Sequence, residues 1–370
     1  MYFKRSILYS ALSACAHLAA PLHPRTLIVF PETEVRAGPP AQVAIADLNE
    51  AELMAGGTAA YAAEDFNKAA NYFERLVDSF PASEKRLPAA YDAGLARQKM
   101  GDHAAAKARF ELVIAADTAN GEVGSDGLDA LQRVAECEYS LGQFSEAAAT
   151  LARLIARADL PLARRADVAT QRGVCLWKAH RLGEGEDQLR AALALYKSGD
   201  ALDGSASQAQ FYLAETFRTY FEELTLNPSA ASEKELTDQL ESKAQMLLSA
   251  QGHYLRCIRL GDPEWATASG FRIGELFEHF HAAMVDAPVP KDLDAEQQDA
   301  YRAELKQRVR VLVTKAIEAY EKTLAAAERV NATNPFIEKT RASLERLKAF
   351  LLETKVGLSA SSSFEHFGLD

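Results

Sequence analysis

The strongest constraint on the fold is an internal repeat of Ala- and Leu-rich helical segments that end at short Pro, Gly or Asp breaks. In each copy a small residue precedes a large apolar residue by four positions, and another apolar or small residue follows three positions later. The copies are Ala69, Phe73 and Leu76; Ala106, Phe110 and Val113; Ala147, Leu151 and Leu154; and, more weakly, Gly185, Leu189 and Ala192. This spacing predicts amphipathic helices. Because no single unit can bury its apolar face alone, the units must stack.

Each copy follows another helix that carries a small residue at one fixed position. These residues are Gly57, Gly94, Ala135 and Gly173, which lie 37, 41 and 38 residues apart. The paired helices, with small residues at the close approach and Phe73 and Phe110 between them, resemble the tetratricopeptide repeat family, whose unit is about 34 residues. The resemblance implies an all-α, right-handed superhelix whose A-helices, the first of each pair, line a concave groove for ligand peptides.

The second half keeps this plan with longer helices. Phe211–Phe217 and Phe271–Phe277 share the pattern F-x-[LI]-[AG]-E-x-F and are interpreted as parts of two A-helices. Their B-helices are expected at about 234–259, with Ala250 and Tyr254, and at about 300–330, with Ala316 and Tyr320. A last helix over about 335–355 reads as a cap, because Pro335 is tolerated in a first turn and its charged face can meet water.

The predicted fold is therefore all-α, a tetratricopeptide superhelix of about six helix pairs with a C-terminal capping helix. The expected organisation is a signal peptide over 1–15, an extended linker over 16–48, regular repeats over 49–198, degenerate long-helix repeats and the cap over 199–355, and a flexible tail over 356–370.

The N-terminus has the features of an export signal, with Lys4 and Arg5 before the apolar run from Ser6 to Leu12. The run is too short to span a bilayer. Leu12-Ser13-Ala14-Cys15 resembles the bacterial lipobox, and this resemblance implies cleavage before Cys15 and its lipidation. Three interpretations remain open: a lipoprotein, a soluble exported protein cleaved at Ala14-Cys15-Ala16, and a cytoplasmic protein.

Charge constrains the partners. The chain holds 41 basic and 52 acidic residues, a formal net charge of −11, and such a surface repels phosphate backbones, so no nucleic-acid partner is expected. Four residues after the small A-helix residue the sequence has Tyr61, Gln98, Tyr139 and Trp177, and one residue after it Glu136, Glu215 and Glu275. If these positions line the groove, they would accept a peptide with apolar and basic side chains. The alternative is that the aromatic residues pack under neighbouring helices and the glutamates are solvated.

Signs of catalysis are scarce. The sequence has no phosphate-binding loop, no HExxH, no nucleophile elbow and no dinucleotide turn, so neither enzyme activity nor a cofactor is expected. Glu278 and His281 have the ExxH spacing of di-iron bundles, with Glu275 and His279 beside them, but no second ExxH occurs. No metal site is predicted. Cys137, Cys175 and Cys257 are interpreted as small buried residues rather than disulfide partners.

The sequence therefore predicts a non-enzymatic scaffold that binds partner proteins. The repeats and the lipobox together resemble the tetratricopeptide lipoproteins of bacterial outer-membrane assembly and other envelope machines. That resemblance implies export to the periplasm or anchoring at the outer membrane. Two alternatives are a cytoplasmic adaptor and an accessory subunit of an enzymatic or metal-dependent complex that uses the Glu275–His281 helix.

Overall fold

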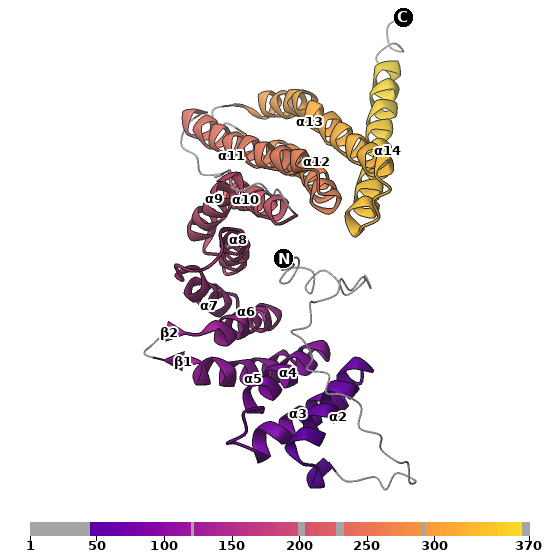
Figure 1. The fold of residues 1–370 in the computed structure, drawn as a ribbon. Helices are drawn as coiled ribbons and strands as arrows, with labels where there is room; N and C mark the ends of the chain where they lie inside the picture. Colours follow the sequence, from indigo (N-terminus) through magenta and orange to yellow (C-terminus); the bar gives the residue numbers. More distant parts are fainter. Residues whose placement is uncertain (1–44, 120–121, 199–203, 227–232, 290–292, 365–370) are drawn as a thin grey trace, which may run out of the picture. The chain divides into compact units, whose positions relative to one another are not determined.

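A computed structural model describes residues 45–119, 122–198, 204–226, 233–289 and 293–364. Nearly all of these residues are helical (Figure 1). The elements are η1 (Ile45–Asp47), α2 (Glu50–Ala62), α3 (Phe66–Ser79), α4 (Arg86–Lys99), α5 (His103–Ala116), β1 (Thr118–Ala119), β2 (Glu122–Val123), α6 (Ser125–Ser140), α7 (Phe144–Ile155), α8 (Leu162–Lys178), α9 (Leu182–Ser198), α10 (Gly204–Glu223), α11 (Glu233–Leu260), α12 (Pro263–Val285), α13 (Ala295–Arg329) and α14 (Pro335–Phe364). The predicted signal peptide and nearly all of the predicted linker lie outside the described residues.

The chain divides into two compact units, Met1–Arg181 and Leu182–Asp370. Unit 1 contains α2 to α8, unit 2 contains α9 to α14, and within each unit every helix packs against its neighbours in sequence. The pairs are α2/α3, α4/α5 and α6/α7 in unit 1, and α10/α11 and α12/α13 in unit 2, followed by α14. Helix α8 ends unit 1, and α9 begins unit 2. The expected all-α repeat fold, with about six pairs and a final helix, is confirmed.

The glycines of unit 1 lie where the sequence pattern requires close helix approach. A Cβ atom on Gly57 would come within 2.5 Å of the Phe73 ring, and one on Gly94 within 2.6 Å of the Phe110 ring. Both rings are fully buried. The small residue of each A-helix therefore leaves the space that the B-helix phenylalanine fills, as the repeat predicts.

The turns between A- and B-helices show the same repeat register in the backbone. Glu64, Gly101, Gly142 and His180 all have positive φ, at 60°, 80°, 76° and 57°, and they lie 37, 41 and 38 residues apart, the offsets of the small A-helix residues. Glycine adopts this conformation freely, whereas Glu64 and His180 adopt it at some energetic cost. The same turn conformation is thus present at Glu64 and His180, where the sequence has no glycine to indicate it.

The longest offset, 41 residues, has a structural cause. The short antiparallel pair β1–β2, with Thr118 opposite Val123, is inserted between α5 and α6. Asp117 supports the insertion, because its Oδ2 accepts a 2.7 Å hydrogen bond from the Gly127 amide in the first turn of α6. The sequence analysis did not predict this hairpin.

Unit 2 uses the same packing with longer helices. A side chain at Gly274 of α12 would collide with the ring of Tyr320 on α13, which is fully buried. The helix predicted at about 234–259 is α11, Glu233–Leu260, and the one predicted at about 300–330 is α13, Ala295–Arg329. Tyr320 thus fills the space that Phe73 and Phe110 fill in unit 1, and Tyr254 of α11 is also fully buried.

One boundary prediction needs correction. The last helix was expected to end near residue 355, with a flexible tail from 356, but α14 continues to Phe364. The added residues contain no proline, and a helix that is already formed extends at little cost through residues that do not break it. Among the described residues, none of the helices is both long and apolar enough to cross a membrane.

Candidate functional site: the A-helix face of unit 1

Six polar and aromatic side chains from three successive A-helices of unit 1 interact with one another. We call this group the A-helix cluster. Its members are Tyr61 on α2, Tyr91, Asp92 and Gln98 on α4, and Arg133 and Glu136 on α6.

Glu136 forms the inner end of the cluster. Its side chain is 5% exposed, and its Oε2 accepts hydrogen bonds from Gln98 Nε2 at 3.0 Å and from Arg133 Nη1 at 2.9 Å. Its Oε1 is buried without a hydrogen-bond partner among the described residues. A buried carboxylate is costly without a counter-charge, so the ion pair with Arg133 is what allows Glu136 to lie there.

Tyr91, Tyr61 and Asp92 form the outer part of the cluster. Burial raises the pKa of Tyr91, while the charge of Arg133 and a hydrogen bond with it act to lower that pKa. Burial also raises the pKa of Tyr61; Arg133 opposes this rise, and the charges of Asp92 and Tyr91 add to it. The hydroxyl of Tyr61 is therefore within electrostatic reach of both Asp92 and Arg133.

Asp92 differs from Glu136, the other acidic residue of the cluster. Its side chain is half-buried, and desolvation raises the pKa of its carboxyl from 3.8 to about 6. Across the described residues, no hydrogen bond or ion pair reaches this carboxylate. Asp92 was missed by sequence reasoning, although it lies two residues before Gly94, the position that Arg133 holds before Ala135. The repeat phase was thus the signal that could have found both residues.

The predicted aromatic ladder has a strong packing role. Tyr61 and Tyr139 each meet the first residue of the following B-helix edge to face, Phe66 and Phe144, with ring centroids 5.3 Å apart in both pairs. Tyr139 is 5% exposed, and burial raises its pKa to about 12. Trp177 is half-buried, with Lys178 Nζ 5.5 Å from its ring centroid. Of the predicted ladder, Tyr61 and Gln98 belong to the cluster, whereas Tyr139 is mainly a core residue.

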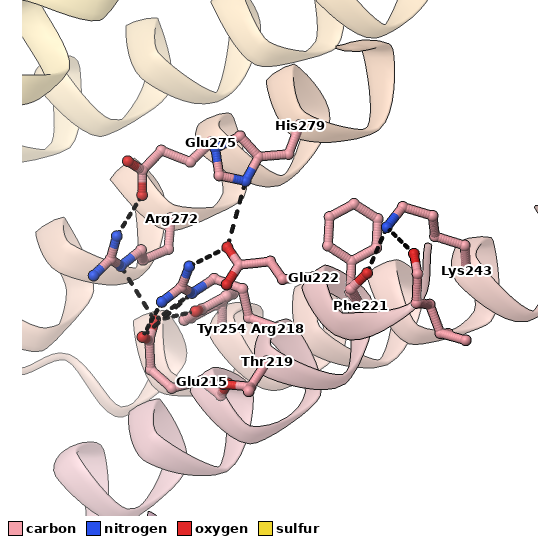
Figure 2. A network of polar contacts seen from close by, with 11 residues as sticks. Glu215, Arg218, Thr219, Phe221, Glu222, Lys243, Tyr254, Arg272, Glu275 and His279 are labelled. Atoms are coloured by element: carbon pink, nitrogen blue, oxygen red, sulfur yellow. Dashed lines mark hydrogen bonds and ion pairs between the residues drawn. The ribbon is translucent and has the colours of Figure 1, made fainter. Parts of the chain in front are cut away.

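Glu215 and Glu275 lie in unit 2, where Figure 2 shows them in a separate polar network. Glu215 is 2% exposed and accepts a short hydrogen bond from the Tyr254 hydroxyl. It also pairs with Arg218 Nη2 at 2.9 Å and with Arg272 Nε at 3.2 Å. Arg272 Nη1 binds Glu275 at 2.6 Å. Both predicted glutamates are thus neutralised by arginines of their own unit.

Figure 2 shows three further residues near this network, Glu222, His279 and Lys243. Glu222 pairs with Arg218 and lies 3.4 Å from Nδ1 of His279, and this pairing raises the pKa of His279. Lys243 is 5% exposed and donates hydrogen bonds to the carbonyl oxygens of Phe221 at 2.6 Å and Leu224 at 2.7 Å, which closes the C-terminal end of α10. These contacts bind α10, α11 and α12 together.

The ExxH pair does not form a metal centre with its neighbours. Glu278 accepts hydrogen bonds from the Tyr320 hydroxyl at 2.5 Å and from Arg346 Nη2 at 2.6 Å. His281 packs against the Phe350 ring, with centroids 6.3 Å apart. Over the part of the chain that the structure describes, no group of three or more His, Cys, Asp and Glu side chains could hold a metal ion. Glu278 instead joins α12 to α13 and α14.

The cysteines are structural. Cys137, Cys175 and Cys257 are fully buried free thiols, as the sequence predicted. Burial raises the pKa of each thiol to about 12. Since the thiolate is the reactive form, all three are unreactive near neutral pH.

A shallow cavity of about 500 Å³ lies among α5, α6 and α7. Its lining includes Glu138, whose carboxylate is held by Lys107 Nζ at 2.8 Å and Thr150 Oγ1 at 2.8 Å, together with Glu111 and Arg153. Because its lining carries both signs of charge, the cavity does not select for a ligand of one charge.

Comparisons with known proteins agree with the repeat pattern. The family model described as "Tetratricopeptide repeat" matches residues 50–83 and 129–159. The first segment contains α2 and α3, and the second contains most of α6 and all of α7. No curated protein matches the chain.

Solved structures resemble the chain at low identity. A tetratricopeptide repeat protein from Parabacteroides merdae is 12% identical over 81% of this chain and 98% of its own, with a TM-score of 0.39. MamA is 13% identical over 68% and 99%, with a TM-score of 0.40. The apo form of RapI is 9% identical over 83% and 100%, with a TM-score of 0.44. We rest no argument on these likenesses. Two segments of the chain thus match the tetratricopeptide repeat model, and both lie within an all-α repeat fold.

Proposed function

We propose that the chain is a non-enzymatic scaffold of the bacterial cell envelope that binds partner proteins on the A-helix face and holds them in a multiprotein complex. Tetratricopeptide repeats generally act through protein binding. The observation that carries the proposal is the A-helix cluster, in which Tyr61 on α2 and Asp92 and Gln98 on α4 remain partly exposed. Rows of this kind on stacked repeats are suited to an extended segment of another protein.

The chemistry of this face favours a partner with basic or apolar segments. The net charge of −11 attracts basic segments at long range, and the tyrosine rings offer apolar surface with polar tips. The envelope location rests on the sequence alone, through Lys4, Arg5 and the lipobox-like end at Cys15. Several acyl chains at Cys15 would anchor the scaffold stably, because membrane attachment needs more than one chain.

Site-specific photo-crosslinking tests the binding face. A photoreactive amino acid replaces Gln98 on α4 in the full chain, and the matched control replaces Asn67, which is exposed on the B-helix α3. We expect one partner to be crosslinked reproducibly from position 98 and not from position 67. Equal crosslinking from both positions, or none from position 98, would refute binding on the A-helix face.

The location is tested separately. Cells that express the native gene or the Cys15→Ala variant are fractionated, and the mature N-terminus is measured by intact mass. We expect an acylated Cys15 in the membrane fraction and loss of this attachment in the variant. An intact Met1 in the soluble cytosolic fraction would contradict the envelope proposal and leave a cytoplasmic adaptor.

A further inference from the structure

Acidic residues on a binding face attract a partner only where their charge is free. Glu136, Glu215 and Glu275 are each paired with an arginine of the same chain, at distances between 2.6 and 2.9 Å. A cation from a partner would have to displace that arginine, which is costly at Glu136 and Glu215 because both carboxylates are buried. These three glutamates therefore serve the structure of the units more than the recognition of a ligand.

Asp92 is in the opposite state. Within the described ranges its carboxylate has no hydrogen bond or ion pair, although the side chain is half-buried on α4. The nearest basic residue of the cluster, Arg133, is already engaged by Glu136 at 2.9 Å and by the Tyr91 hydroxyl. A desolvated carboxylate without a partner lowers the stability of the free chain, and a cation from outside would relieve this cost.

The surroundings of Asp92 match one kind of cation. Tyr61 on α2 lies within electrostatic reach of Asp92, and its side chain is partly exposed. Lysine and arginine side chains combine a charged end, which pairs with a carboxylate, and an apolar stem, which packs on aromatic rings. A bare metal ion would gain little from the tyrosine ring, and it would find only one carboxylate.

We propose that Asp92, with Tyr61 nearby, is the subsite of the A-helix face that receives a lysine or arginine side chain of the partner protein. This inference rests on the proposed function and adds which residue selects the basic side chain. Asp92 is the specificity-determining residue, while Arg133 and Glu136 hold the cluster in place. The charged and titratable groups around the subsite are Tyr61 on α2, Tyr91 on α4, and Asp129, Arg133 and Glu136 on α6.

Selection from a random heptapeptide library displayed on phage tests the subsite. The full chain is compared with Asp92→Asn and with Glu84→Gln, which removes the same charge from the exposed turn between α3 and α4. We expect the unmodified chain and Glu84→Gln to enrich Lys or Arg at one fixed peptide position, and Asp92→Asn to lose that enrichment. An unchanged preference in Asp92→Asn would overturn the subsite.

Calorimetry with a selected peptide gives the second measurement. Replacing its basic residue by norleucine should weaken binding about tenfold for the unmodified chain, and very little for Asp92→Asn. The tenfold difference should shrink between pH 7.5 and pH 5, because protonated Asp92 attracts no cation. Equal affinities of the two peptides for the unmodified chain would refute the subsite.

The two proposals fail in different ways. Peptides that bind the A-helix face without a basic residue would reject the Asp92 subsite and leave the scaffold function standing. If the unmodified chain selects no peptide and position 98 crosslinks no partner, both the A-helix binding face and the subsite on it are rejected.

Discussion

The buried ring of Phe73 occupies the space in which a side chain at Gly57 would lie, with Cε1 2.5 Å from the position of a Cβ atom. Gly57→Ala should therefore destabilise unit 1. Overpacking costs about 1–3 kcal/mol, and the higher helix propensity of alanine returns about 1 kcal/mol. We expect a net loss of up to about 2 kcal/mol in the free energy of unfolding, measured by urea denaturation.

Gly252→Ala is the matched control. It replaces another helical glycine, but a Cβ there would meet only Arg256 at 3.9 Å, so the variant should gain stability. Adding Phe73→Leu to Gly57→Ala should restore part of the loss, since the smaller side chain frees space. Equal effects of Gly57→Ala and Gly252→Ala would contradict the packing explanation.

Lys243 should contribute strongly to the stability of unit 2. Its Nζ binds two carbonyl oxygens at the end of α10 and lies 4.1 Å from the centroid of the Phe221 ring. Lys243→Met keeps the apolar stem and removes the donor, which leaves two carbonyl groups without it. We expect a loss of about 1–3 kcal/mol in unfolding free energy. Lys234→Met, an exposed change earlier on α11, should have almost no effect.

His279 and His281 should respond to pH with opposite signs. A hydrogen bond with Glu222 raises the pKa of His279, with the charges of Glu222 and Glu275 adding to it against burial and Arg218. The stabilisation of the folded state by protonated His279 is thus present below pH 6.5 and is lost as pH rises through the folded-state pKa of His279. Burial lowers the pKa of His281, against the charges of Asp286 and Glu278. That residue destabilises the folded state below pH 6.5 and ceases to do so as pH rises.

Denaturation at pH 5.5 and pH 8 measures both effects. His279→Gln should cost more stability at pH 5.5 than at pH 8, whereas His281→Gln should be relatively more favourable at pH 5.5. Because both side chains are partly exposed, each change should stay below about 1 kcal/mol. Changes of the same sign in the two variants would refute the assignment.

The three buried thiols should resist modification in the native chain. With pKa values raised to about 12, Cys137, Cys175 and Cys257 carry very little thiolate at pH 8. We expect no rapid reaction of these three with Ellman's reagent until guanidinium unfolds the chain, after which all three react. Mass mapping of the modified cysteines identifies each site, and rapid native labelling of any of the three would contradict their burial.

The repeat pattern predicted the fold well because it reports packing directly. The spacing of residues such as Gly57, Phe73 and Phe110 reflects which side chains must meet between helices. The residues with positive φ in the turns between paired helices lie at the same offsets along the chain. The hairpin after α5 was missed, although Asn120-Gly121 is a strong hairpin signal in the sequence, because a helical repeat was expected there. The extension of α14 was missed because Gly and Ser suggested a tail.

The site was harder to predict than the fold. Their positions within the repeat identified Gln98 and Glu136, which are hydrogen-bonded to each other. Position within the repeat could not distinguish a carboxylate without a partner from one in an ion pair. Whether Glu136 is neutralised depends on Arg133, three residues away on the same helix, and whether Asp92 is free depends on every helix around it. Such pairing is a property of the folded unit, so it becomes visible only when the side chains are placed.

Asp92→Asn should stabilise the free chain at neutral pH. Because burial raises the pKa of Asp92 from 3.8 to about 6, the folded chain binds more protons than the unfolded chain between these values, and stability falls as pH rises through them. The shift corresponds to at most about 3 kcal/mol, and solvent screening of the half-buried side chain reduces this to about 1–2 kcal/mol. Thermal unfolding should show a higher Tm for the variant at pH 7 and nearly equal values at pH 4, while Glu84→Gln changes neither. A lower Tm at pH 7 would mean that the carboxylate has a structural partner. Asp92 would then lower the stability of the free chain and raise its affinity for a basic segment, which is the trade-off expected at a binding site.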